Sequence, residues 1–169
     1  VKASVDALQP ALDAVVCIGN VRAMGIGAPN SNYYNGCIEN AANLVWPGIV
    51  PVAEKFQEAL GIPCRVTNDA SAAAMGEMTY GVARGMKNFI MITLGTGVGS
   101  GIVCDGKIVY GSDGFAGELG HVIVDRGESA RACGCGRKGC LETYTSATGV
   151  ARTAREILQK NTADSLLRE

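Results

Sequence analysis

The feature that most restricts how this chain can fold is one short segment holding its only histidine and three of its seven cysteines. His121 is followed by Cys133, Cys135 and Cys140, with glycines between the cysteines. One imidazole and three thiolates are a standard closed tetrahedral set for structural Zn²⁺, and glycine permits the tight turns that such convergence needs. We interpret the segment as a zinc loop rather than as free cysteines beside a surface histidine. Three nearby cations are expected to offset the thiolate charge: Arg131, Arg137 and Lys138.

Composition narrows the function classes. The 169 residues are 47% hydrophobic and 18% charged, which is typical of a globular protein. A formal net charge of -1 provides no basic surface for nucleic acid or for a membrane. The odd cysteine total argues against a disulfide framework and predicts a reducing, cytoplasmic location. Four scattered cysteines are expected to be small buried hydrophobes: Cys17, Cys37, Cys64 and Cys104.

Hydrophobic periodicity and turn residues predict alternating helices and strands, and therefore an α/β fold. The Asp105-Gly106 pair predicts a tight hairpin between two of the strands. Residues 29–32 are expected to form a loop. Helices are predicted over 4–20, 50–60, 70–80 and 146–158, and strands over 22–28, 63–67, 88–94, 99–104 and 107–110.

A glycine-rich turn between two predicted strands could cradle phosphate oxygens with its backbone N–H groups. Its candidate residues are Gly95, Thr96, Gly97 and Gly99. Taken alone, the pattern is a weak signal and favours an ordinary glycine-rich hairpin turn. It is neither a Walker motif, since no Gly-Lys-Ser/Thr follows, nor a Rossmann fingerprint, since a strand follows it.

Two further polar sites could carry chemistry. Asn68 and Asp69 stand between a predicted strand and a predicted helix, where a carboxylate could act as a general base. The alternative for this pair is an ordinary helix N-cap. Glu118 and Glu142 flank the zinc loop and could bind sugar hydroxyls, or could be solvated surface charges. Weaker candidates for lining a groove are residues 27–29 and Asn43.

The chain resembles the ROK family in four motifs, which occur in the same order in both. The motifs are residues 66–70, 94–101, 117–121 and 133–142. That family comprises sugar kinases, notably bacterial glucokinases, and sugar-responsive repressors. The resemblance implies an actin-like (ribonuclease H-like) two-lobed sugar kinase fold, with both lobes partial here. Residues 1–85 would belong to the N-terminal lobe, and residues 86–169 to the C-terminal lobe with the phosphate turn and zinc loop. The Asp-x-Gly-Gly-Thr motif that opens family members is not present, so the chain resembles the middle of a longer protein and is expected to be inactive alone.

The resemblance also implies roles for individual residues. Asp69 would be the general base that takes the proton from the 6-hydroxyl of a hexose, most simply glucose, during phosphorylation by ATP. The turn at Thr96 and Gly97 would hold the ATP phosphates with Mg²⁺. His121 would bind structural zinc through one ring nitrogen and the sugar through the other. The remaining sugar ligands would be Asn68, Glu118 and Glu142.

Two other function classes remain open. A ROK repressor would share the fold and the zinc loop, but it needs neither a base at Asp69 nor a phosphate turn. A zinc-stabilised module without catalysis would leave both features unexplained. In the kinase interpretation the partners are the hexose and ATP, with no nucleic acid or membrane, and the full-length protein is expected to be a homodimer. The sequence leaves the hexose open, because N-acetylmannosamine, fructose and allose kinases of the family use nearly the same residues.

Overall fold

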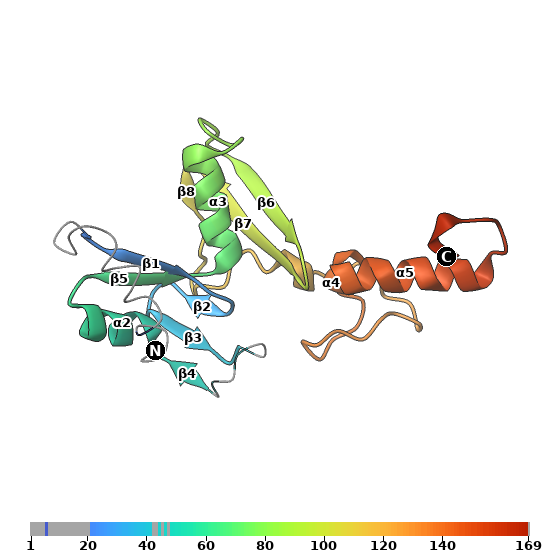
Figure 1. Cartoon of the computed structure of the whole chain (residues 1–169), viewed down its shortest axis with the longest axis horizontal. Helices are drawn as coiled ribbons and strands as arrows, with labels where there is room; N and C mark the ends of the chain where they lie inside the picture. Colours follow the sequence, from blue (N-terminus) through green and yellow to red (C-terminus); the bar gives the residue numbers. More distant parts are fainter. Residues whose placement is uncertain (1–5, 7–20, 42–43, 45, 47, 169) are drawn as a thin grey trace.

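The computed structural model describes residues 6, 21–41, 44, 46 and 48–168 (Figure 1). Cys17, Asn43 and nearly all of the predicted helix over 4–20 lie outside these residues. The strands are β1 (Met24–Gly27), β2 (Ser31–Asn32), β3 (Cys37–Glu39), β4 (Ile49–Val50), β5 (Cys64–Thr67), β6 (Phe89–Leu94), β7 (Val98–Cys104) and β8 (Lys107–Ile108). The helices are α2 (Val52–Leu60), α3 (Asp69–Tyr80), α4 (Glu142–Thr145) and α5 (Ala147–Lys160), with 3-10 turns η2 (Leu119–His121) and η3 (Leu166–Arg168).

The first part of the fold is built around α2. Val52 and Phe56, four residues apart, lie on the buried face of this helix. The helix ends at Gly61, whose φ of 67° is the left-handed conformation that glycine adopts without strain. The core beneath it is formed by Ile38, Ala41, Val52, Phe56 and Cys64. Burial of these side chains fixes β5, which pairs in parallel with β1 and leads directly to the start of α3.

Helix α3 joins two parts of the fold: the part around α2, and the sheet formed by β6, β7 and β8. It follows β5 in the first part and packs on β7 in the second (Figure 1). Small side chains allow the close approach. A Cβ on Gly101 would lie 2.6 Å from the Cβ of Ala74, and one on Gly99 would lie 2.9 Å from the Cβ of Ala70. The alanines of α3 and the glycines of β7 therefore place the beginning of α3 beside the turn between β6 and β7.

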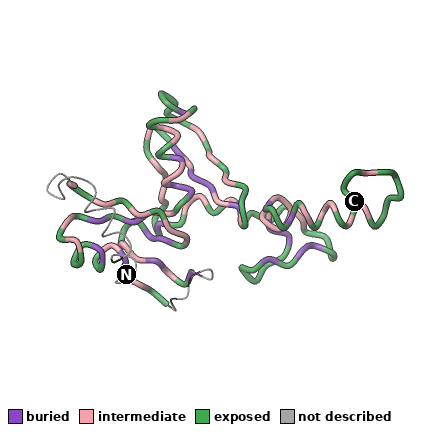
Figure 2. The backbone as a smooth tube through the Cα atoms, viewed as in Figure 1, coloured by how far each residue is buried: buried purple, intermediate pink, exposed green. Residues whose placement is uncertain are grey.

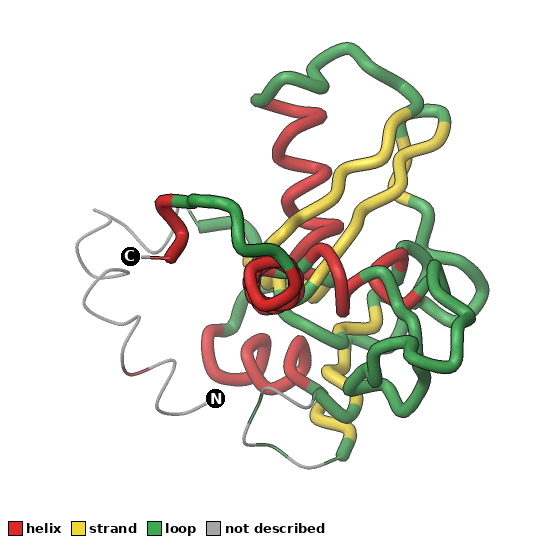
Figure 3. The backbone as a smooth tube through the Cα atoms, turned by 90° about the vertical axis from the view of Figure 1, so that its right-hand side faces the viewer, coloured by secondary structure: helices red, strands yellow, loops and turns green. Residues whose placement is uncertain are grey.

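The sheet with the order β6-β7-β8 is antiparallel, as predicted. Its two long strands lie beside α3 (Figure 3). Leu94 pairs with Val98, so residues 95–97 form the glycine-rich turn. Asp105 and Gly106 have φ values of 49° and 73°. Positive φ at both central residues is what a type I′ hairpin turn requires, and the predicted hairpin is confirmed.

Helix α5 extends away from the three sheets of the described residues (Figure 1). Ser146 begins it, because its Oγ accepts a hydrogen bond from the Gly149 N–H at 3.2 Å. Gly149 is its only buried residue, and the far end of the helix is largely exposed (Figure 2). None of the helices in the described part of the chain combines the length and the apolar character needed to cross a bilayer.

Two sequence predictions differ from the structure. Residues 31–50 contain a three-stranded antiparallel sheet, β2-β3-β4, where no strand was predicted. Its strands have only two or three residues, which is too short for an alternating pattern to stand out. Cys104 is exposed rather than buried, because it lies at the end of β7 next to the hairpin turn. Cys64 is buried as expected, whereas Cys37 is only partly buried.

Candidate functional site

Ten of the twelve residues predicted for binding or catalysis line one cavity of about 690 Å³. They come from both parts of the fold: Asn68, Asp69, Gly95, Thr96, Gly97, Gly99, Glu118, His121, Cys135 and Glu142. Cys133 and Cys140 are buried and are not among the residues that line the cavity. Pro29 also lines the cavity, whereas Gly27 and Ala28 are not among its lining residues. The sequence analysis missed three lining residues with polar side chains, because they look like ordinary turn and strand positions: Asn30, Asn40 and Thr93.

Asn68 and Asp69 stand at the start of α3. The Asn68 Oδ1 accepts hydrogen bonds from the N–H groups of Ala70 at 2.9 Å and Ser71 at 3.3 Å. The N-cap interpretation is therefore correct for this oxygen, and the amide nitrogen remains available to a ligand. The Asp69 Oδ1 accepts from the Ala70 N–H at 2.9 Å, while no described residue donates to its Oδ2. Asp69 thus combines a fixed carboxylate with an oxygen that can accept a proton.

The 3-10 turn η2 brings Glu118 and His121 to the cavity. Gly120 is buried against β7, where a side chain would overlap the carbonyl oxygen of Val98. The Ser100 hydroxyl donates to the Gly117 carbonyl and accepts from the Leu119 N–H. These contacts hold η2 against the first half of β7, so the Glu118 carboxylate and the His121 imidazole are presented from a rigid support.

The acidic groups of the cavity influence one another. Burial raises the pKa of the Glu118 carboxyl above its usual value; the charges of Asp69 and Glu142 act in the same direction, while His121 opposes them. A cavity lined by three carboxylates and one imidazole offers several charge-assisted hydrogen bonds to a polyhydroxylated molecule. It also contains a carboxylate that can accept a proton during reaction.

The glycine-rich turn forms another wall of the cavity. Its ends are held by the segment that follows the cysteines: the Ala147 N–H donates to the Gly95 carbonyl at 2.9 Å, and the Val98 N–H donates to the Glu142 Oε2 at 2.9 Å. Within the turn, the Gly95 N–H donates to the Gly97 carbonyl at 3.0 Å. The turn is therefore a fixed feature of the cavity wall.

The histidine and the three cysteines converge as predicted. Their donor atoms all lie within 4.8 Å of one another. The Cys133 Sγ is 3.7 Å from the His121 Nδ1, and the Cys135 Sγ is 3.7 Å from the Cys140 Sγ. Ligand atoms on a tetrahedral zinc ion, with bonds of about 2.0 to 2.3 Å, are separated by about 3.5 to 3.8 Å. The four side chains therefore fit zinc, and the Nδ1 of His121 is the nitrogen on the metal side.

Two glycines shape the cysteine loop. Gly136 has a φ of 85° in the turn where its N–H donates to the Cys133 carbonyl at 3.0 Å. Gly139 has a φ of 75°, and a side chain there would overlap the carbonyl of Asp125. Hydrogen bonds from Arg137 lower the pKa of Cys135 to about 6, whereas burial raises that of Cys140 to about 11. Arg137 thus favours the thiolate form of Cys135, in the direction that the sequence predicted.

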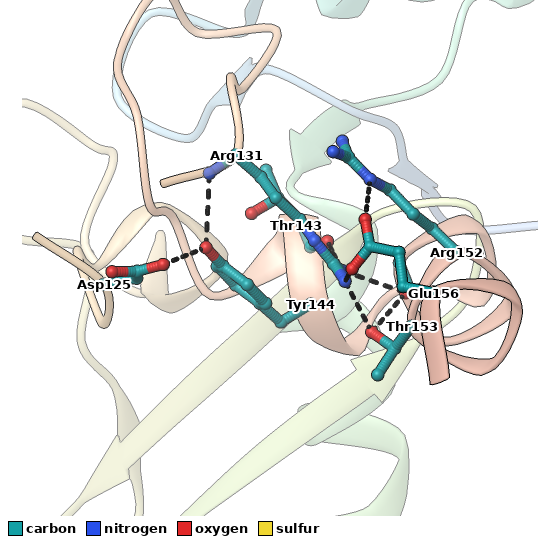
Figure 4. Close-up of polar contacts among 8 residues, drawn as sticks. Asp125, Arg131, Thr143, Tyr144, Arg152, Thr153 and Glu156 are labelled. Carbon is teal, nitrogen blue, oxygen red and sulfur yellow. Dashed lines mark hydrogen bonds and ion pairs between the residues drawn. The ribbon is translucent and has the colours of Figure 1, made fainter. Parts of the chain in front are cut away.

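Arg131 was expected to offset thiolate charge, but it turns away from the cysteines and toward α5. Its side chain is only 6% exposed and forms an ion pair with Glu156 at 2.8 Å. It also donates to the carbonyls of Thr143 at 2.8 Å and Gly149 at 3.1 Å, and to the hydroxyl of Thr153 at 2.9 Å (Figure 4). The prediction for Arg131 is wrong, because the hydrogen bonds of its guanidinium go to acceptors on α4 and α5.

Tyr144 also contacts Arg131. The Arg131 guanidinium lies 4.5 Å from the centre of its ring, and the Tyr144 hydroxyl accepts from the Arg131 N–H at 3.2 Å while donating to Asp125 at 2.5 Å (Figure 4). The donated hydrogen bond lowers the pKa of Asp125. The segment that precedes the cysteines is therefore joined to α4 and α5 through Asp125 and Arg131.

We expect Arg131→Ala to lower the free energy of unfolding of the full-length protein by about 2 to 4 kcal/mol, because buried carbonyls lose their donor. Urea denaturation measures the change. Arg152→Ala is the matched control: Arg152 binds the same Glu156 at 2.8 Å, but its side chain is 56% exposed, and such surface pairs contribute little. Equal losses in the two variants would contradict the anchoring role of Arg131.

Comparisons with known proteins agree with this geometry. The model of the ROK family matches residues 2–169. The glucokinase of Halalkalibacterium halodurans is 48% identical over 134 residues, which are 79% of this chain and 40% of that protein. A ROK family glucokinase from Streptomyces griseus, solved with glucose and AMPPNP, is 36% identical with a TM-score of 0.75, over 96% of this chain and 51% of that one. A ROK family transcriptional regulator, a homologue of the E. coli Mlc protein, is 27% identical with a TM-score of 0.82, over 97% and 40%.

The chain thus spans about half or less of the length of these relatives. The likeness to the Streptomyces griseus glucokinase confirms the predicted α/β, actin-like fold of the ROK sugar kinases, of which this chain holds a part. The division near Gly85 stays a prediction. With a family match over almost the whole sequence, the chain belongs to the ROK family.

Proposed function

We propose that the full-length protein transfers the γ-phosphoryl group of ATP to the 6-hydroxyl of a hexose, and that the hexose is glucose. The observation that carries the proposal is the convergence of Asp69, Glu118, His121 and Glu142 on the cavity that the glycine-rich turn also lines. A sugar held by these side chains and a triphosphate held by the turn would therefore lie next to each other in the cavity. Phosphoryl transfer depends mainly on such positioning and on charge stabilisation.

Each group has a role in this proposal. Asp69 accepts the proton of the attacking 6-hydroxyl through the oxygen that lacks a described donor. Asn68, Glu118, His121 and Glu142 hydrogen-bond the other hydroxyls and fix the ring. The backbone N–H groups of the turn at Thr96 and Gly97 bind phosphate oxygens, whose charge bound Mg²⁺ would offset.

Zinc has an orienting role in the proposal. Its ligands would be His121 through Nδ1 and the thiolates of Cys133, Cys135 and Cys140, a set of four that leaves no position for substrate. Metal binding at Nδ1 would leave Nε2 for the sugar, because a metal on one ring nitrogen fixes the protonation of the other. Stable thiolates favour the reducing cytoplasm as the proposed location.

A substrate panel on the full-length protein tests the proposal. ADP release would be measured with ATP, Mg²⁺ and each of glucose, N-acetylmannosamine, fructose and allose. We expect glucose to give the highest kcat/KM. If another hexose gave a higher kcat/KM, the proposed substrate would be wrong but the proposed reaction would stand. No turnover with any of the sugars would reject the kinase proposal.

The second candidate is a sugar-responsive regulator, favoured by the TM-score of 0.82 to a ROK transcriptional regulator. A sensor has no need of a general base or of a phosphate-binding turn, and the kinase proposal accounts for Asp69 and the glycine-rich turn in the cavity. Sugar binding without ATP turnover by the full-length protein, together with retardation of DNA in a gel, would favour the regulator.

A further inference from the structure

The glycine-rich turn has a feature that phosphate binding does not explain. Gly97 is not in the left-handed region of φ, so its backbone conformation does not require glycine. Instead, a Cβ at this position would lie 2.6 Å from the Oε2 of Glu142 and 3.5 Å from its Cδ. The missing side chain makes room for a carboxylate that is 45 residues away in the sequence.

That carboxylate is held at the turn by one oxygen. The Glu142 Oε2 accepts from the Val98 N–H at 2.9 Å, and no described residue donates to Oε1. Because Glu142 lines the cavity, one of its oxygens is anchored while the other can receive a sugar hydroxyl. The anchor sets where the second oxygen can lie.

We infer that Gly97 is a positioning residue for the sugar subsite, acting through Glu142, and not only part of the phosphate turn. This inference rests on the proposed function, since it assumes that Glu142 binds the hexose. A methyl group at residue 97 would push the carboxylate off the Val98 N–H. The contact would be made with the far end of the flexible Glu142 side chain. The added methyl group would therefore move the carboxylate that binds the sugar and leave the backbone in place.

Gly95 offers a matched control in the same turn. It also lies outside the left-handed region, and a Cβ there would meet no atom within 4 Å. Gly95→Ala therefore adds the same methyl group to the same turn without touching Glu142. A difference between the two variants in sugar affinity isolates the contact with the carboxylate.

The test is glucose binding to the full-length protein by isothermal titration, without nucleotide. We expect Gly97→Ala to weaken glucose affinity about tenfold, the scale of one charge-assisted hydrogen bond, and Gly95→Ala to change it less than about twofold. The melting temperatures of both variants should stay close to that of the unaltered protein. Failure of Gly97→Ala to fold, or an unchanged glucose affinity with weakened AMPPNP binding, would overturn the inference.

A double-mutant cycle shows whether Gly97 acts through Glu142. In a Glu142→Ala background, Gly97→Ala should have no further effect on glucose affinity, because the group that it displaces is gone. Additive losses would overturn the inference while leaving the kinase proposal intact. If the unaltered protein binds no glucose, the proposed function fails and the inference fails with it, and that outcome is visible before any variant is made.

Discussion

Replacing Asp69 with asparagine is expected to lower the kcat for hexose phosphorylation by the full-length protein about a thousandfold, while glucose affinity changes little. The carboxylate is the proposed proton acceptor, and general-base catalysis contributes about 10² to 10⁴-fold. Asparagine keeps the size and can still accept the Ala70 N–H that the Asp69 Oδ1 accepts now, at 2.9 Å. Steady-state kinetics and isothermal titration with glucose separate the two effects.

Asp105→Asn is the matched control for this variant. Asp105 lies in the hairpin turn between β7 and β8 with a φ of 49°, a conformation that asparagine also tolerates, and it is not among the residues that line the cavity. Its kcat should equal that of the unaltered protein. If Asp69→Asn kept near-normal turnover, Asp69 would not be the base.

The second large effect is expected for Cys135→Ser. The full-length protein should carry about one zinc per chain, since four ligands form one tetrahedral site, and the variant should lose most of it. Loss of the ion frees the His121 ring that it orients, so glucose affinity should fall about 10- to 100-fold, the usual effect of disturbing a metal ligand's surroundings. Elemental analysis of protein purified without chelator and isothermal titration measure the two quantities.

Cys104→Ser controls for the loss of a thiol, because Cys104 is exposed and does not belong to the cluster. It should retain both zinc and glucose affinity. A Cys135→Ser protein that lacked zinc but bound glucose normally would refute the coupling between the metal and the sugar subsite.

Features that depend on neighbouring residues could be predicted from the sequence. The Asn68 cap, the Asp105-Gly106 turn and the end of α2 at Gly61 are each determined by the conformational preferences of a few adjacent residues. The metal cluster was predictable for a related reason, since its three cysteines lie within eight residues and only His121 is more distant.

The family resemblance grouped distant residues into one site, but individual contacts between distant residues could not be predicted from the sequence pattern. Arg131 resembled a thiolate partner in the sequence, but folding places the carbonyl of Gly149 and the carboxylate of Glu156 within its reach. The contact between Glu142 and the Val98 N–H joins residues 44 positions apart. No spacing rule connects such pairs, because they meet only after α4 packs beside the turn between β6 and β7.

One measurement tests the central claim most directly: a crystal structure of the full-length protein with glucose, with anomalous data collected at the zinc edge. The account predicts one zinc bound by the Nδ1 of His121 and the sulfurs of Cys133, Cys135 and Cys140. It also predicts a glucose whose hydroxyls lie within hydrogen-bond distance of the His121 Nε2 and of Asp69. A metal bound to other residues, or a glucose far from either side chain, would contradict it.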